Sequence, residues 1–460
     1  MPFLSRWRNN GEQDDTIKNG DLTKGSIKEH IKNIAIPSSI GYFFHTMFNV
    51  TDTFFAGKIS TQSLAALSLT FSIFFMIIAI AGGMSQGVTA LIGNALGEKN
   101  KEHAKQIVWH SLILSISLAV ILSITGLLAA PYLMKILGAH GKYLNEALSY
   151  INVILFGSIF FVGAFFSNAM LNSIGNTVAF RNFLIGGFIL NTILDFWFVR
   201  GGLGVSPLGV KGIALATIII EFLGMAYLIT NLKKSHLLED MPKFKYDKQI
   251  IFSFLKQGVP PTVNMLLMAL GMFIITYYIS PFGKHVVAAY GVSIRIEQIF
   301  LLPSIGLNVA VLSIVSQNNG AKLYDRVKET VWLAQKIGVF IWIVGMFFIY
   351  TFGEHLMSLF TADEMVIKAG LGYLYAAGSA LYAYMLVFIN ISLLQGIKKP
   401  ALLVYLSLFR QLIVPIAFFS LLAFFKAPLD LYWWSIVLVI WGSAIFMLWY
   451  AKRELKLLNP

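Results

Sequence analysis

The chain has 460 residues, of which 57% are hydrophobic and only 12% are charged. This composition lies far outside the range of soluble globular domains and indicates an integral membrane protein. The net charge of +13 does not indicate nucleic-acid binding, because the basic residues are spread over the loops and form no patch interleaved with aromatic side chains. The chain has no cysteine, so disulfide, thiol and iron–sulfur chemistry are excluded.

Residues 1–30 are polar and mixed in charge. They lack the apolar core and the small-residue cleavage site of a signal peptide. We therefore expect a cytoplasmic tail that is partly disordered.

The rest of the chain divides into apolar stretches separated by short polar joints. A helix needs roughly 20 apolar residues to cross the hydrocarbon core of a bilayer. The predicted helix cores are 33–56, 66–93, 107–134, 147–171, 180–200, 211–231, 252–279, 286–315, 330–360, 367–395, 401–425 and 430–451. The predicted fold class is an all-α integral membrane protein with twelve transmembrane helices.

Most of the 35 Lys and Arg residues lie on one side of the membrane if both termini are cytoplasmic. Cytoplasmic loops of multi-pass proteins carry such an excess of positive charge. We therefore expect a multi-pass protein with both termini in the cytoplasm.

The sequence matches itself at an offset of 223 residues, without a gap between residues 37 and 174. The matched pairs include Pro37 with Pro260, Gly97 with Gly320, Lys99 with Lys322 and Tyr150 with Tyr373. The predicted divisions are a tail at 1–30, an N-lobe at 31–232, a linker at 233–250, a C-lobe at 251–452 and a tail at 453–460. Parallel six-helix repeats of this kind are typical of transporters whose halves rock about a central cavity. The alternative is that the duplication only builds a stable scaffold.

Several polar residues inside the spans of the first half have apolar partners in the second half. Asp52 is matched by Ile275, Asn168 by Ile391, Asn191 by Val414 and Thr217 by Ile440, and Asp195 by Phe418, or by Pro415 if a small gap is allowed. Since the scaffold does without these polar groups, they predict a binding site confined to the N-lobe.

Asp52 is the leading candidate. A carboxylate at bilayer depth costs roughly 2.5–3.5 kcal/mol on insertion scales, so it normally faces a cavity or a partner. His45, Asn49 and Asp52 have the spacing that places side chains along one face of a helix. The alternatives are that Asp52 is hydrated near the outer membrane edge and that His45 is a packed histidine.

Asn191 and Asp195 are one helical turn apart on the fifth span, and Thr217 and Glu221 repeat this spacing on the sixth. The first pair offers oxygen ligands for a small hard cation, or a carboxyl group whose neutral form is favoured by apolar surroundings. An interfacial role for Asp195 and a structural role for Glu221 are the alternatives.

Asn168 and Asn172 lie late in the fourth span, and buried amides need partners, which carboxylates on neighbouring helices would supply. In the second half Arg295, Glu297 and Arg410 are predicted to form a packed network of ions or hydrogen bonds. A proton relay is the alternative.

Pro37 removes one backbone hydrogen bond from the first helix and lets it kink. Its match at Pro260 indicates that a proline at this place belongs to the shared scaffold. The alternative is a bend of the helix that depends on protonation.

No Walker loop, HExxH or EF-hand pattern occurs, and no loop is large enough for a nucleotide site. We therefore expect an ion gradient as the driving force and no cofactor other than the coupling ion, H⁺ or Na⁺.

A series of short motifs follows the parallel repeat: DTFFAG, AALSL, LIGNALGEKN with its partner SQNNGAK, SIGN, NTILD and KGIALAT. In this order they resemble the multidrug and toxic compound extrusion (MATE) family, specifically its DNA-damage-inducible F (DinF-like) branch, between about residues 30 and 455. The resemblance implies a V-shaped, two-lobe fold in the bacterial inner membrane. It implies a transporter, not an enzyme, that exports bulky and often cationic amphiphiles in exchange for protons or sodium.

The resemblance also implies that the ion site lies in the N-lobe. The matching residues are Asp52 and Asp195 as the carboxylates, with Asn191, Thr217 and Asn168, and a Na⁺ ion would take Asp52, Asn191, Asp195 and Thr217. Secondary candidates are Asn49, His45, Glu221 and Asn172, and Pro37 falls on the kinking proline of the family. The expected partners are small amphiphilic substrates and the lipid bilayer, without nucleic acid, and we expect a monomer.

One departure from the family concerns the second lobe. Another bacterial branch carries acids in spans seven and ten, whereas 252–279 and 367–395 contain no Asp or Glu here, which argues against a C-lobe cation site. The runner-up function is a flippase for lipids or lipid-linked oligosaccharides, whose cavity needs Arg and Lys for phosphates. The membrane interior offers chiefly Arg295 and Arg410. An intramembrane enzyme is disfavoured, because the polar residues are dispersed.

Overall fold

The computed structural model describes residues 20–202 and 204–458, so most of the expected N-terminal tail and the last two residues lie outside it. The described residues form helices, with one isolated bridge between Gly202 and Val205. The first half consists of α2 (Ile27–Ile59), α3 (Thr61–Gly97), α4 (Lys101–Ile136), α5 (Gly141–Phe156), α6 (Ser158–Ser173), α7 (Val178–Arg200) and α8 (Val210–Lys233). The second half consists of α9 (Lys248–Ile279), η2 (Ser280–Phe282), α10 (Lys284–Gly320), α11 (Tyr324–Ser358), α12 (Glu364–Gly396), α13 (Leu402–Leu408), η3 (Phe409–Ile413), α14 (Val414–Phe424) and α15 (Leu429–Leu458).

The predicted all-α membrane fold is confirmed. Within the described residues, ten helical segments are long and apolar enough to cross a membrane, and the bent pair α5–α6 makes an eleventh. The twelfth span is α2, which does not pass the same test of composition. Its apolar stretch is interrupted by polar side chains such as His45, Asn49 and Asp52.

The fourth span is broken, although the sequence predicted one continuous core at 147–171. α5 and α6 meet at Gly157 with a bend of 47°. A Cβ atom at Gly157 would collide with the side chain of Ile218 on α8. The glycine therefore lets α8 approach the fourth span closely at the point where that span bends.

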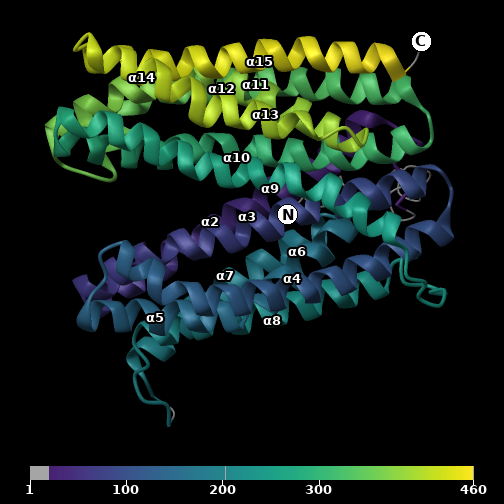
Figure 1. The fold of residues 1–460 in the computed structure, drawn as a ribbon, viewed down its shortest axis with the longest axis horizontal. Helices are drawn as coiled ribbons and strands as arrows, with labels where there is room; N and C mark the ends of the chain where they lie inside the picture. Colours follow the sequence, from purple (N-terminus) through teal and green to yellow (C-terminus); the bar gives the residue numbers. More distant parts are fainter. Residues whose placement is uncertain (1–19, 203, 459–460) are drawn as a thin grey trace, which may run out of the picture.

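Figure 1 shows the two halves as separate lobes, with α2 to α8 on one side and α10 to α15 on the other. The lobes meet through α3 with α9 and through α2 and α3 with α10. The first part of α2 belongs to the interface, because Ile27, Ile31 and Ile34 lie in the same hydrophobic cluster as the core of the C-lobe. Pro37 thus separates a part of α2 that packs on the C-lobe from the part that carries Asp52.

The lobes approach most closely where α3 and α10 end. A Cβ atom at Gly97 would collide with the carbonyl oxygen of Gln317, and one at Gly320 would collide with the carbonyl oxygen of Asn94. The two glycines occupy equivalent places in the repeat, so each lobe contributes one glycine to the crossing. Asn94 also donates from Nδ2 to the carbonyl of Gly396, at 2.8 Å.

Residues 20–26, which lie within the tail that was expected to be partly disordered, form an N-terminal strap between the lobes. Gln317 of the C-lobe accepts a hydrogen bond from the Leu22 amide (2.8 Å) and donates one to the carbonyl of Ser173 in the N-lobe (2.7 Å). Arg326 holds the strap through the carbonyl of Leu22, and the Leu22 side chain is only 2% exposed. The polar composition of this segment concealed these contacts, because they are made mainly by its backbone.

Candidate functional site

Three helices of the N-lobe bring polar side chains together around Asp52. Asn191 on α7 donates from Nδ2 to Asp52 Oδ1 at 3.2 Å, and Thr217 on α8 donates from Oγ1 to Asp52 Oδ2 at 3.3 Å. Thr217 Oγ1 also lies 3.0 Å from the carbonyl of Ile213, so its single proton is shared between two acceptors. Asp52 and Thr217 are buried, and Asn191 is fully enclosed. The Asp52 carboxyl is therefore fixed in place by two neighbouring helices.

Asp195 completes this group, one turn from Asn191 on α7. Its side chain is fully buried, and its carboxyl group lies within hydrogen-bonding reach of the Asp52 carboxyl. No N–H or O–H donor reaches either of its oxygens among the described residues. Two carboxylates side by side repel each other, so such a pair requires a shared proton or a bound cation.

The donor set of this group is made of oxygen atoms. Asn191 Oδ1 and both Asp195 oxygens lack a hydrogen-bond donor in the part of the chain that the structure describes. Carboxylate, amide and hydroxyl oxygens suit a hard cation such as Na⁺, and a proton on either carboxyl would also resolve their repulsion. The same described residues contain no group of three His, Cys, Asp or Glu side chains arranged for a metal ion.

Tyr150 on α5 is a neighbour of this group that the sequence did not single out. Its ring is 3% exposed, and it lies within electrostatic range of both Asp52 and Asp195. The repeat identified Tyr150 only as a match to Tyr373. The site was found by looking for polar residues that have an apolar partner in the other half. Tyr150 has a tyrosine as its partner, so this comparison did not reveal it.

The remaining candidates are not joined to the carboxyl pair by hydrogen bonds among the described residues. Asn168 and Asn172 are buried on α6, each with an oxygen that has no partner there. His45 and Asn49 are partly exposed, and the His45 ring contacts its helix neighbours Tyr42 and Phe48. Glu221 is buried one turn beyond Thr217 without a hydrogen bond to it. Pro37 is buried within α2, which continues on both sides of it.

The sequence profile of the MatE family matches this chain twice, at residues 37–197 and 260–419. The chain belongs to the MatE family. The two matches begin at Pro37 and Pro260, which is the offset of the internal repeat. A MatE protein is a transporter, and this chain is therefore a multi-pass membrane transporter and not an enzyme.

Several MatE proteins are similar along most of the chain. A Bacillus subtilis protein named "Probable multidrug resistance protein YoeA" is 25% identical over 352 residues, which cover 74% of this chain and 75% of that protein. A Shewanella oneidensis protein named "FAD transporter" is 26% identical over 401 residues, covering 86% and 88%. A solved structure of a MOP superfamily transporter from Pyrococcus furiosus has a TM-score of 0.90 and 27% identity, covering 96% and 99%.

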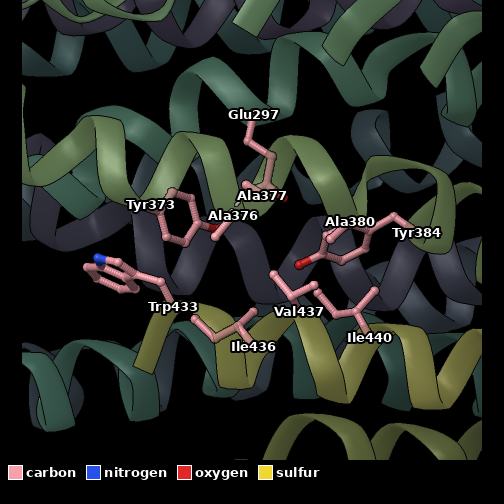
Figure 2. A pocket seen from close by; sticks show the side chains of 10 residues that line it. All are labelled: Glu297, Tyr373, Ala376, Ala377, Ala380, Tyr384, Trp433, Ile436, Val437 and Ile440. Carbon is pink, nitrogen blue, oxygen red and sulfur yellow. Dashed lines mark hydrogen bonds between the residues drawn. The ribbon is translucent and has the colours of Figure 1, made fainter. Parts of the chain in front are cut away.

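The C-lobe of this MatE chain contains a second buried acid, Glu297 on α10. Its Oε2 accepts a hydrogen bond of 2.6 Å from the hydroxyl of Tyr373 on α12, and its Oε1 has no partner among the described residues. Figure 2 shows both residues at a small cavity together with Tyr384 and Trp433. The sequence analysis had named Glu297, which lies on the eighth span, only as part of a network with Arg295 and Arg410.

The predicted network of Arg295, Glu297 and Arg410 does not form. Arg295 is exposed, whereas Glu297 is buried and held by Tyr373. Arg410 is buried without a partner among the described residues. The sequence predicted a network because all three charged residues lie in apolar stretches. In the structure, however, their side chains lie in different surroundings.

Proposed function

We propose that this MatE protein is a secondary active multidrug exporter, which moves amphiphilic and often cationic compounds out of the cell by antiport with H⁺ or Na⁺. The observation that carries the proposal is the buried pair of carboxyls, Asp52 and Asp195, without a counter-cation among the described residues. Buried acids of this kind mark ion pathways in membrane proteins. The printed names of relatives such as the multidrug resistance protein of B. subtilis support the cargo class.

The coupling ion binds in the N-lobe in this proposal. Asp52, Asp195, Asn191 and Thr217 hold the ion, and Asn168 lies deeper in the same lobe. When Asp52 and Asp195 are ionised, the protein favours the outward-open form, in which the lobes are apart on the outer side of the membrane. A proton or Na⁺ neutralises the pair, after which the part of α2 beyond Pro37 bends and the space for cargo shrinks. An ion shifts this equilibrium only to the extent that it binds one form more tightly than the other.

The orientation in the proposal follows the basic residues, which place both termini in the cytoplasm of a bacterial inner-membrane protein. The linker end of the lobes is then the inner side. The strap and the crossing of Gly97 and Gly320 lie at this end. The arrangement therefore corresponds to a transporter that is closed toward the cytoplasm. We expect it to work as a monomer, since each lobe contributes its own half of the cavity.

Transport by purified protein in liposomes tests the proposal. Efflux of a cationic dye is driven separately by a pH gradient and by a Na⁺ gradient, for the wild type, Asp52→Asn, Asp195→Asn and Glu146→Gln. Glu146 is a matched acid on α5, which bonds Ser63 and not the carboxyl pair. We expect gradient-driven efflux that the first two variants lose and the control retains. Normal, equally gradient-dependent efflux by Asp52→Asn would contradict the site.

The same liposomes distinguish the cargo classes. The panel includes FAD, because one relative is named an FAD transporter, and a fluorescent phospholipid for the flippase alternative. Gradient-driven movement of the cationic dye alone supports multidrug export. Movement of the phospholipid alone replaces the proposal with the flippase.

A further inference from the structure

Arg410 is the one buried arginine of the described C-lobe spans, and no described residue pairs with it. Its side chain is 4% exposed, and Nε, Nη1 and Nη2 are all enclosed without a hydrogen-bond acceptor among the described residues. A guanidinium group stays protonated in proteins and carries five N–H donors. A complete set of unmet donors on a permanent charge therefore points to a ligand that is not part of the chain.

The local backbone sets Arg410 in this position. It lies in η3, a π-helical turn between α13 and α14 that ends at Ile413, two residues before Pro415. Proline has no N–H and its ring clashes with the carbonyl of the preceding turn, so the helix widens there. Phe409 and Ile413 of the same turn are exposed, whereas Arg410 is turned inward. π turns of this kind occur frequently at functional sites.

The nearest charged and polar groups do not neutralise Arg410. No acid of the described residues lies within salt-bridge distance of it, and the buried acid Glu297 is bonded to Tyr373 instead. Tyr384 on α12 is the side chain that lies within electrostatic range of both Arg410 and Glu297. In Figure 2 the Tyr384 ring lies along the small cavity of the C-lobe. A ligand on Arg410 therefore has the Tyr384 hydroxyl within electrostatic range and no carboxylate of the described residues in contact.

We propose that Arg410 is an anion-binding site in the C-lobe, which takes a carboxylate or phosphate group with the Tyr384 hydroxyl as a neighbouring donor. The planar fork of a guanidinium matches two oxygens of such a group, which a spherical chloride ion does not offer. The group has two sources, a free anion from solution or the anionic end of a transported compound. The site does not depend on the proposed exchange of ions at the N-lobe carboxyls.

Thermal unfolding of the purified protein tests the binding itself. Inorganic phosphate and acetate replace chloride at constant ionic strength, for the wild type, Arg410→Met, Arg410→Lys and Arg295→Gln. Methionine removes the buried charge and keeps an apolar side chain of similar length, so the variant is expected to fold. Arg295→Gln removes an exposed arginine from the same lobe and serves as the matched control.

A ligand that binds only the folded state raises its melting temperature in a saturable way. We expect the melting temperature to rise in the wild type and in Arg295→Gln, and not to rise in Arg410→Met. In Arg410→Lys, the anion concentration that gives half of the maximal rise should be at least tenfold higher than in the wild type. Equal rises in the wild type and Arg410→Met, or no rise in the wild type, would overturn the proposal.

Liposome efflux of one anionic and one cationic dye separates the two sources. Loss of anionic efflux alone in Arg410→Met assigns the site to transported cargo. Unchanged efflux of both dyes, with the thermal shift lost, assigns it to a free anion. The thermal measurement needs no ion gradient. The proposed anion site can therefore be supported or overturned independently of the ion exchange proposed for the N-lobe.

Discussion

The two lobes share a scaffold but differ in how they hold buried acids. In the N-lobe, Asp52 and Asp195 come from two helices and face each other. In the C-lobe, the buried acid Glu297 lies on α10 and accepts a hydrogen bond from Tyr373. The equivalent tyrosine of the N-lobe, Tyr150, lies beside the carboxyl pair. The tyrosine is common to both lobes, and the placement of the acids separates them.

This difference teaches what each lobe is suited to bind. A pair of adjacent carboxyls changes its charge with the ion it holds, because ionising both is unfavourable without a cation. A lone carboxyl with a hydroxyl donor can remain in one state. The N-lobe is therefore the better candidate for a site that exchanges ions, whereas the C-lobe acid Glu297 is held by Tyr373 and is not paired with Arg410.

The largest expected effect comes from removing one member of the N-lobe pair. Asp52→Asn keeps the shape of the side chain but abolishes its charge change, so gradient-driven efflux should fall by at least about tenfold, which corresponds to about 1.4 kcal/mol. Initial efflux rates in liposomes under a pH or Na⁺ gradient measure this. Retention of the wild-type rate would break the assignment of ion exchange to the N-lobe.

Substitutions at the crossing of α3 and α10 test whether the two lobes contribute equally to this contact. Gly97→Ala and Gly320→Ala each place a methyl group against a carbonyl of the other lobe, and overpacking of this kind costs about 1–3 kcal/mol. Melting temperatures should fall for both variants by similar amounts. Gly186→Ala on α7 is the control, because nothing lies within 4 Å of its added methyl. Unequal losses would show that the repeat is not symmetrical at the crossing.

The two equivalent tyrosines should differ in their contribution to stability. Tyr373→Phe removes the donor to a buried carboxyl and should cost about 1–3 kcal/mol, read as a lowered melting temperature. Tyr150→Phe removes a hydroxyl that bonds no other described residue, so its effect should be smaller. A larger loss for Tyr150→Phe would reverse this part of the comparison.

The smallest effect on transport is expected for Glu297→Gln. The amide oxygen still accepts the hydrogen bond from Tyr373, so the efflux rate should stay within about twofold of the wild type, less than about 0.5 kcal/mol. The same gradient-driven assay measures it. If Glu297→Gln lost coupling as completely as Asp52→Asn, the C-lobe would contain a second ion site and the contrast between the lobes would fail.

The sequence predicted the parts of this molecule that depend on composition and repetition. Hydropathy located the spans, and the repeat drew attention to Asp52, Asn191, Asp195 and Thr217, which the structure places within one group. Polar residues without a counterpart in the other half stand out in a duplicated chain, and helical spacing orients each pair toward one face.

The rest depends on neighbours that a single sequence does not reveal. The close contact of Gly157 with Ile218 involves another helix, which the pattern of the fourth span alone does not reveal. Spacing along one helix could not determine that Asn168 and His45 form no hydrogen bond with the carboxyl pair in the described structure. The absence of a partner for Arg410 among the described residues depends on how several helices pack around η3, and the apolar flanking sequence gave no sign of it.

The N-terminal strap lies outside the spans, but it contributes to the equilibrium between the form that is open to the cytoplasm and the form that is open to the outside. Gln317 connects the strap and the N-lobe through separate hydrogen bonds, each contributing about 0.5–1.5 kcal/mol. Any form with the lobes apart at this end must break some of these bonds and expose Leu22, or move the strap with one lobe. These contacts stabilise the form in which the lobes are together at this end, so substitutions in residues 20–26 are expected to shift the balance between the forms without touching the carboxyl pair or Arg410.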